Sequence, residues 1–141
     1  MAKQKVIFVC IHNSARSQMA EELLRKMAGD RFEVESAGLE PGKLNPVVVK
    51  ALKEEGIDIE GKATKGVFDL YKAGKFYNYV IAVCDGANAE RCPVFPGAAK
   101  SIHWNFTDPS KFEGTDEQKL ERVRAVKEEI KEKLAQWIAT V

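Results

Sequence analysis

Cysteine and histidine are scarce in this sequence. Only three cysteines and two histidines occur among its 141 residues. An odd number of cysteines excludes a framework in which every cysteine forms an internal disulfide, so we expect reactive or buried thiols in a reducing compartment. Neither histidine stands at a spacing typical of zinc ligands, and we predict no metal site.

Charge of one sign and long apolar runs are also lacking. The 22 basic residues nearly balance the 21 acidic ones, for a net charge of +1, and they form no basic block. Nothing in this balance favours nucleic acid or a membrane as a partner. The first apolar stretch, Val6–Cys10, is far too short for a signal-peptide core or a membrane span. We therefore expect a cytoplasmic protein, and a monomer.

Strand and helix patterns alternate along the chain. Apolar β-formers predict buried strands at Lys5–Cys10, Phe32–Ala37, Tyr79–Cys84 and Ala99–Trp104. Apolar periodicity and cap residues predict helices over Ser17–Ala28, from Asn45-Pro46 to Gly56, over Val67–Ala73 and over Leu120–Ile138. This order predicts an α/β fold, in which a four-stranded parallel sheet lies between helices on both faces of one three-layer domain.

Polar residues follow the ends of the predicted strands. Cys10, Ser36 and Cys84 lie at the carboxyl ends of the first three strands, and Asp108 follows the fourth. Ligands of open parallel sheets bind outside these ends. If the strand order is 2-1-3-4, the first and third strands are neighbours, so Cys10 and Cys84 end side by side. We expect the chemistry at this edge.

The loop between the first strand and the first helix has the composition of an oxyanion cradle. It comprises Cys10, Ile11, His12, Asn13, Ser14, Ala15, Arg16 and Ser17. Its backbone N–H groups and the helix N-terminus favour an anion, and Arg16 supplies a planar fork for a tetrahedral oxyanion. The same field stabilises a Cys10 thiolate, to which Ser17 can donate a hydrogen bond while Asn13 braces the loop. We assign His12 no chemistry.

A simpler interpretation of this loop is structural. A cysteine that ends a strand is often only a buried core residue, and an arginine six positions later can belong to a surface ion pair. The preceding strand, the following helix, Ser17 and Asn13 together favour the cradle.

The motif CIHNSARSQMAE at residues 10–21 closely resembles the Cys-x5-Arg-Ser loop of the low-molecular-weight protein tyrosine phosphatase superfamily. Its second half is similar to the thioredoxin-coupled arsenate reductases, because phosphatases usually have proline where Gln18 stands. The resemblance implies one such domain over residues 1–141. It extends to Ser36-Ala37-Gly38, Leu44-Asn45-Pro46, Gly56-Ile57-Asp58-Ile59, Cys84…Cys92-Pro93 and His103-Trp104…Asp108-Pro109.

This resemblance implies a relay of three cysteines. Cys10 attacks arsenate, and Cys84 then attacks Cys10, so that arsenite leaves and a Cys10–Cys84 disulfide forms. Cys92 moves the disulfide to Cys84–Cys92, which thioredoxin reduces, without a tightly bound cofactor. The spacing from Cys84 to Cys92 is one residue longer than is usual in the family. The alternative is that Cys84 is a core residue and Cys92 a surface thiol.

Asp108 lies in an Asp-Pro pair that resembles the general-acid loop of the superfamily. A carboxylic acid facing the cradle can protonate the departing oxygen. The alternative role is a turn or helix-capping aspartate. Ser110 stands where phosphatases usually have an aromatic residue for phosphotyrosine, which argues against tyrosine phosphatase activity as the main role.

Some members of the family bind potassium near the cradle. The corresponding positions here are Asn13, Glu21, Ser36 and Lys65, the last in place of an aspartate. A lysine ammonium cannot ligate a cation and could take its place beside Glu21. We therefore predict that potassium does not activate this protein.

Three classes of function remain open from the sequence, and they differ in their use of cysteine. An arsenate reductase needs Cys10, Cys84 and Cys92. A phosphatase acting on phosphotyrosine or a small phosphomonoester needs only Cys10, with Arg16 and Asp108. An oxyanion-binding or thiol-redox module without catalysis needs none of them as a nucleophile.

Overall fold

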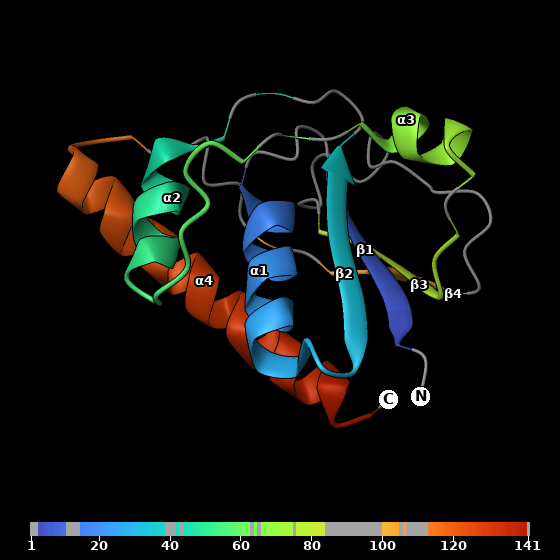
Figure 1. Cartoon of the computed structure of the whole chain (residues 1–141). Helices are drawn as coiled ribbons and strands as arrows, with labels where there is room; N and C mark the ends of the chain where they lie inside the picture. The colour runs from blue at the N-terminus through green and yellow to red at the C-terminus, as the bar shows by residue number, and fades with distance from the viewer. Residues whose placement is uncertain are drawn as a thin grey trace.

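Four parallel strands form the central sheet of the protein. The computed structural model describes residues 3–10, 15–38, 42, 44–62, 64, 66–74, 76–83, 100–104, 106 and 113–140. The strands are β1 (Gln4–Cys10), β2 (Phe32–Gly38), β3 (Tyr79–Ala82) and β4 (Lys100–His103). Their order in the sheet is β2-β1-β3-β4, and every neighbouring pair is parallel (Figure 1). The predicted fold class and strand order are confirmed.

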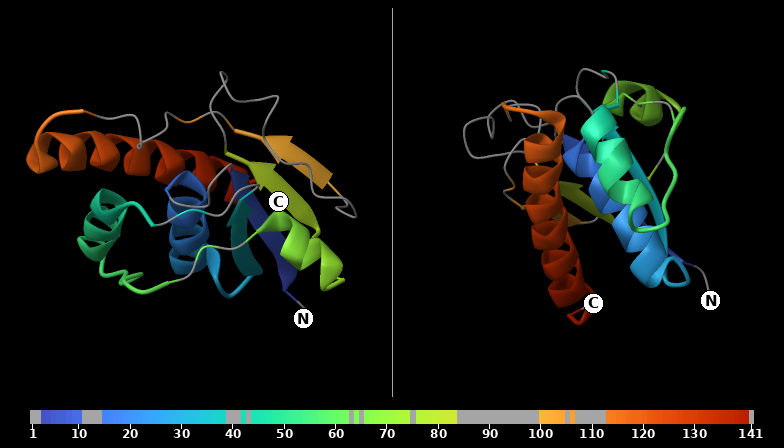
Figure 2. Two further views of the ribbon diagram at one scale, coloured as in Figure 1. Left: turned by 90° about the horizontal axis from the view of Figure 1, so that it is seen from above. Right: turned by 90° about the vertical axis from the view of Figure 1, so that its left-hand side faces the viewer.

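The helices divide unequally between the two faces of the sheet. They are α1 (Arg16–Ala28), α2 (Pro46–Lys53), α3 (Val67–Lys72) and α4 (Asp116–Ile138). α1, α2 and α4 lie on one side of the sheet, and the short α3 lies on the other (Figure 2). The larger core lies between the sheet and α1, α2 and α4.

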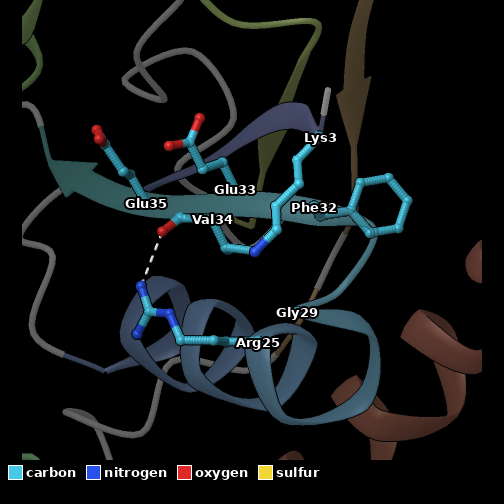
Figure 3. Close-up of a pocket in the computed structure, with 7 residues that line it drawn as sticks. All are labelled: Lys3, Arg25, Gly29, Phe32, Glu33, Val34 and Glu35. Atoms are coloured by element: carbon cyan, nitrogen blue, oxygen red, sulfur yellow. Dashed lines mark hydrogen bonds between the residues drawn. The ribbon is translucent and has the colours of Figure 1, made fainter. Parts of the chain in front are cut away.

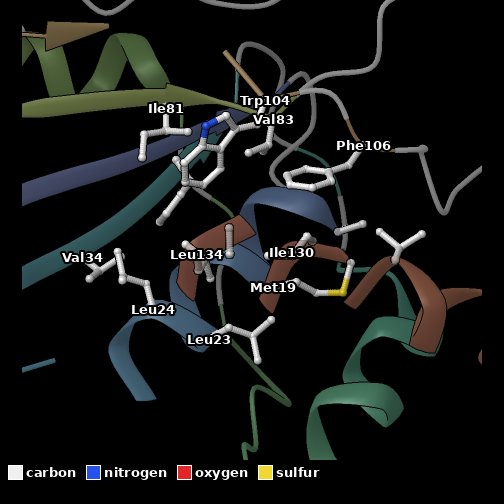
Figure 4. Close-up of a cluster of buried hydrophobic side chains, with 14 of the residues drawn as sticks. Met19, Leu23, Leu24, Val34, Ile81, Val83, Trp104, Phe106, Ile130 and Leu134 are labelled. Carbon is white, nitrogen blue, oxygen red and sulfur yellow. The ribbon is translucent and has the colours of Figure 1, made fainter. Parts of the chain in front are cut away.

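Alternation along β1 separates the two cores. Val6, Phe8 and Cys10 face the large cluster, whereas Ile7 and Val9 belong to a smaller one beside α3. This is the period-two geometry of a strand covered on both faces. The large cluster gathers side chains from the sheet, α1, α2 and α4, among them Met19, Leu23, Trp104, Phe106, Ile130 and Leu134 (Figure 4).

Helix boundaries differ from the predicted ones where caps outweigh apolar periodicity. α4 begins at Asp116, one turn before Leu120, because Thr115 and Gln118 form a reciprocal capping box. α2 ends at Lys53, and the chain then turns through Gly56, which has φ 79°. The third predicted strand, Tyr79–Cys84, is longer than β3, which ends at Ala82. Val83 nevertheless donates a backbone hydrogen bond to Val9 of β1.

An ion-pair cluster joins α1, α2 and α4 on the side of the sheet that carries the larger core. The carboxylate of Glu55, just after α2, lies 3.0 Å from Lys131 Nζ and 3.1 Å from Lys127 Nζ of α4. Lys26 of α1 lies 3.6 Å from its other oxygen. The hydrogen bonds from Lys131 and Lys127 lower the pKa of Glu55 to about 2.

No helix in the described part of the chain is long and apolar enough to cross a membrane.

Candidate active site

Cys10 is the last residue of the central strand β1. It pairs with Gly38 at the end of β2, and the neighbouring Val9 pairs with Ala82 at the end of β3. Its side chain faces α1 and is only 3% exposed. The first strand therefore places this thiol at the carboxyl edge of the sheet, where ligands of parallel sheets bind.

The start of α1 lies directly against Cys10. Ser17 is the second residue of the helix, is fully buried, and its Oγ lies 2.9 Å from Cys10 Sγ. The N-cap position, Ala15, provides no side-chain hydrogen bond, and the first turn contains no acidic residue. Within this turn, no carboxylate therefore offsets the partial positive charge of the helix N-terminus. A hydroxyl donor and this helix end together can stabilise a thiolate.

Arg16 begins α1 and links the cradle to the segment after β4. Its side chain is 4% exposed, and Nη1 donates a hydrogen bond of 3.2 Å to the backbone carbonyl of Phe106. The Phe106 ring packs edge-on against Trp104, with ring centroids 6.4 Å apart. A buried arginine held in this way presents a fixed guanidinium plane, which suits bidentate recognition of an oxyanion.

The structure brings together Cys10, Ala15, Arg16 and Ser17 of the predicted site. The other predicted site residues lie outside the described part of the chain: Ile11, His12, Asn13, Ser14, Cys84, Cys92 and Asp108. Arg16 contacts Phe106, which is the last described residue before Asp108 in the sequence. The roles predicted for all of these residues, described or not, stay predictions.

Behind the cradle, a buried glutamate collects three polar partners. Glu21 is 1% exposed, and its Oε1 accepts a hydrogen bond of 2.5 Å from Ser36 Oγ of β2. Its Oε2 lies 2.6 Å from Arg25 Nη2 and 2.9 Å from Lys62 Nζ. Burial raises the pKa of Glu21, but the charge of Lys62 and the hydrogen bonds from Lys62, Ser36 and Arg25 outweigh it, so the pKa lies below its ordinary value. Glu21 is therefore ionised at neutral pH.

Sequence reasoning named Glu21 and Ser36 but missed Lys62. It expected an ammonium beside Glu21 from Lys65, which lies outside the described residues. Lys62 follows α2 in an irregular segment, and no periodic pattern points to its partner. The one signal in the sequence for a cationic partner was the adjacent pair of carboxylates, Glu21 and Glu22, and Lys62 contacts both.

One surface pocket of the described residues lies away from the cradle, along the amino-terminal half of β2 (Figure 3). It is lined by Lys3, Arg25, Gly29, Phe32, Glu33, Val34 and Glu35. Arg25 of α1 donates a 2.8 Å hydrogen bond to the backbone carbonyl of Val34, so one acceptor of the edge strand β2 is already paired (Figure 3).

No group of three metal-ligating side chains occurs among the residues that the structure describes.

Comparison with known proteins identifies the family. The sequence pattern of the family named low molecular weight phosphotyrosine protein phosphatase matches residues 5–141. The chain belongs to this family. A similar curated relative is an arsenate reductase of Bacillus licheniformis, 42% identical over 99% of both chains.

Solved structures of the family share the fold. An arsenate reductase in the phosphate binding state superposes with a TM-score of 0.77 at 32% identity, covering 98% of both chains. A thioredoxin-dependent arsenate reductase of Corynebacterium glutamicum has a TM-score of 0.60 at 29% identity, over 95% of this chain and 63% of that one. The resemblance to this family and to its arsenate reductases, drawn from the sequence motifs, is confirmed.

Proposed function

We propose that this protein reduces arsenate to arsenite, with Cys10 as the nucleophile. The observation that carries the proposal is the contact between Cys10 Sγ and Ser17 Oγ at the start of α1, with the buried Arg16 beside it. This arrangement joins a thiol to the groups that bind a tetrahedral oxyanion. The choice of arsenate is supported by relatives named arsenate reductases, which match this chain over nearly their whole length.

In the first step, the Cys10 thiolate attacks arsenic(V), and an S–As bond replaces an As–O bond. Asp108 protonates the departing oxygen, which leaves as water. Arg16 and the backbone N–H groups of Ile11–Ser17 bind the remaining oxygens and stabilise their charge in the transition state. Ser17 donates to the thiolate before the attack, which holds Cys10 in its reactive form.

In the second step, the Cys84 thiolate attacks the Cys10 sulfur. An S–S bond forms while the S–As electron pair passes to arsenic, which leaves as arsenic(III) in arsenite. Cys92 then attacks Cys84, so the disulfide moves to Cys84–Cys92 and Cys10 returns as a thiolate. A thioredoxin dithiol reduces this disulfide and supplies the two electrons of the cycle. The thioredoxin-dependent relative of Corynebacterium glutamicum supports this choice of reductant.

The test is arsenate-dependent NADPH oxidation with thioredoxin and thioredoxin reductase. Wild type is expected to turn over many times, whereas Cys84→Ser and Cys92→Ser each lose multiple turnover. Full activity in both variants would contradict the relay. If thioredoxin fails while glutathione with glutaredoxin succeeds, the substrate assignment stands and the partner changes.

A second candidate function is phosphomonoester hydrolysis, and the family to which the chain belongs favours it. Phosphate and arsenate have the same shape and charge, so weak phosphatase activity is expected from the same cradle. The two functions separate on the cysteines, because hydrolysis of p-nitrophenyl phosphate needs Cys10 but neither Cys84 nor Cys92. A phosphatase main role predicts a kcat/KM for a phosphomonoester that exceeds the value for arsenate.

A further inference from the structure

Glu21 ties three separate segments together directly behind the cradle. It lies four residues after Ser17 on α1, so the two side chains project from the same face of the helix. Ser36, its hydrogen-bond partner, pairs with Phe8 of β1, two residues before the pairing of Gly38 with Cys10. The bond between Glu21 and Ser36 thus fixes the start of α1 against the strand that adjoins Cys10.

Lys62 belongs to the third segment, which runs beside the end of β2. A backbone bridge joins Gly38 to Gly66, so this segment lies next to the residue that pairs with Cys10. The Lys62 side chain is 21% exposed, and its Nζ contacts Glu21 at 2.9 Å and Glu22 at 2.7 Å. One ammonium therefore bridges the segment after α2 to the first two turns of α1.

A potassium ion does not fit beside Glu21 in this arrangement. The ion needs several oxygen ligands, and Glu21 Oε2 already contacts two positive groups, those of Arg25 and Lys62. A further cation at this oxygen would repel both at short range. The other carboxylate oxygen accepts the hydroxyl hydrogen of Ser36.

We propose that Lys62 is a positioning residue of the cradle, which supplies at Glu21 the positive charge that a monovalent cation would otherwise provide. Its ammonium balances the buried carboxylate and holds α1 against β2, so that Ser17 and Arg16 face Cys10 without a bound ion. Removal of Lys62 takes away one of the two positive groups at Glu21 and leaves only Arg25, whose side chain is 46% exposed. A potassium ion can then take the place of the ammonium between the carboxylate oxygens of Glu21 and Glu22.

The test compares Lys62→Met with wild type in potassium chloride and in sodium chloride at equal ionic strength. Thermal unfolding needs no assumption about activity. We expect Lys62→Met to unfold about 3 °C higher in potassium than in sodium, because a ligand that binds only the folded state stabilises it. Wild type is expected to unfold at the same temperature in both salts.

Kinetics with arsenate provide a second readout, which rests on the proposed function. In sodium chloride, kcat/KM of Lys62→Met is expected to fall about fivefold, with potassium restoring most of it. Lys62→Arg keeps the charge and is expected to remain insensitive to potassium. An inactive wild type would contradict the proposed function and leave the unfolding comparison intact.

Two control variants separate this role from simple loss of a surface charge. Lys131→Met removes a lysine that is 32% exposed and paired with Glu55, and we expect no difference between the two salts. Glu22→Gln removes the second partner of Lys62 but leaves the contact with Glu21, so it too is expected to remain insensitive. The proposal is wrong if Lys62→Met unfolds at the same temperature in both salts. It is equally wrong if wild type is stabilised or activated by potassium, a result that needs no variant to fold.

Discussion

Two glutamates, Glu21 and Glu55, each contact several cationic side chains, but in different parts of the molecule. Glu21 is 1% exposed, shares a hydrogen bond with Ser36 and lies behind the cradle. Glu55 has a side chain that is 18% exposed and joins the turn after α2 to α1 and α4. Both have a pKa below the ordinary value, because each gains cationic partners on folding.

The difference between the two clusters separates chemistry from stability. The Glu21 cluster holds the helix whose first residues face Cys10, so changes at this end of the molecule should affect activity. The Glu55 cluster joins the turn after α2 to α1 and α4, and no predicted site residue belongs to it. Changes there should therefore affect the free energy of unfolding but not the activity. Four substitutions test this division.

The largest effect on activity is expected from Cys10→Ser. A serine hydroxyl at this position lacks the acidity and nucleophilicity of the thiol, so arsenate reduction should fall by about a thousandfold or more. Serine fills nearly the same volume, and the unfolding temperature should stay close to that of wild type. Retained arsenite production, measured directly, would remove Cys10 from the mechanism.

Arg16→Lys is expected to lower kcat/KM for arsenate by about a hundredfold. Lysine keeps the charge, but it cannot hold the Phe106 carbonyl and also bind two oxygens of the substrate with a planar fork. The matched control is Arg124→Lys, a half-exposed arginine that pairs with Glu54 on the surface. Steady-state kinetics of the control should match wild type, and an equal loss in both variants would mean that the Arg16 effect is not specific to the cradle.

Ser17→Ala is expected to lower kcat/KM about tenfold, because Cys10 loses the hydroxyl that lies 2.9 Å from its sulfur. The rate of Cys10 alkylation by iodoacetamide should fall in parallel. Ser101→Ala, on the exposed side of β4, is the control and should change neither quantity. Unchanged alkylation in Ser17→Ala would show that the hydroxyl does not support the thiolate.

Glu55→Gln is expected to leave kcat/KM unchanged and to lower the free energy of unfolding at neutral pH by about 1 kcal/mol. The pKa of Glu55 is about 2 in the folded protein against an ordinary value of 4.5. Its contribution is therefore complete above about pH 4.5 and is lost as the pH falls toward 2. Denaturant unfolding across this range should show a smaller loss of stability on acidification in the variant than in wild type. A variant with the same acid dependence would contradict the role of Glu55.

Sequence reasoning predicted the elements whose signals are local. The alternation in β1 and the cap at Asn45 depend on near neighbours, and the predicted strand order followed from topology rules. The start of α4 was placed one turn late, because Thr115 and Gln118 begin the helix before its first apolar position. Cys10 and Ser17 were predicted as partners because a short loop between the strand and the helix returns the start of α1 to the end of β1.

Contacts between distant segments could not be predicted in the same way. Lys62 and Glu21 are brought together by the path of the chain after α2, and Phe106 reaches Arg16 only through the packing of β4. A backbone carbonyl as the acceptor leaves no signal in residue type. The catalytic roles of Cys10, Arg16, Cys84, Cys92 and Asp108 all remain predictions.

The most direct test of the account is a single turnover without any reductant. Fully reduced wild-type protein is mixed with excess arsenate, arsenite is counted, and the disulfide is located by mass spectrometry of peptides. The account predicts about one arsenite per chain and a disulfide between Cys84 and Cys92, because two thiols supply two electrons. Absence of arsenite, or the same yield from Cys10→Ser, would contradict it.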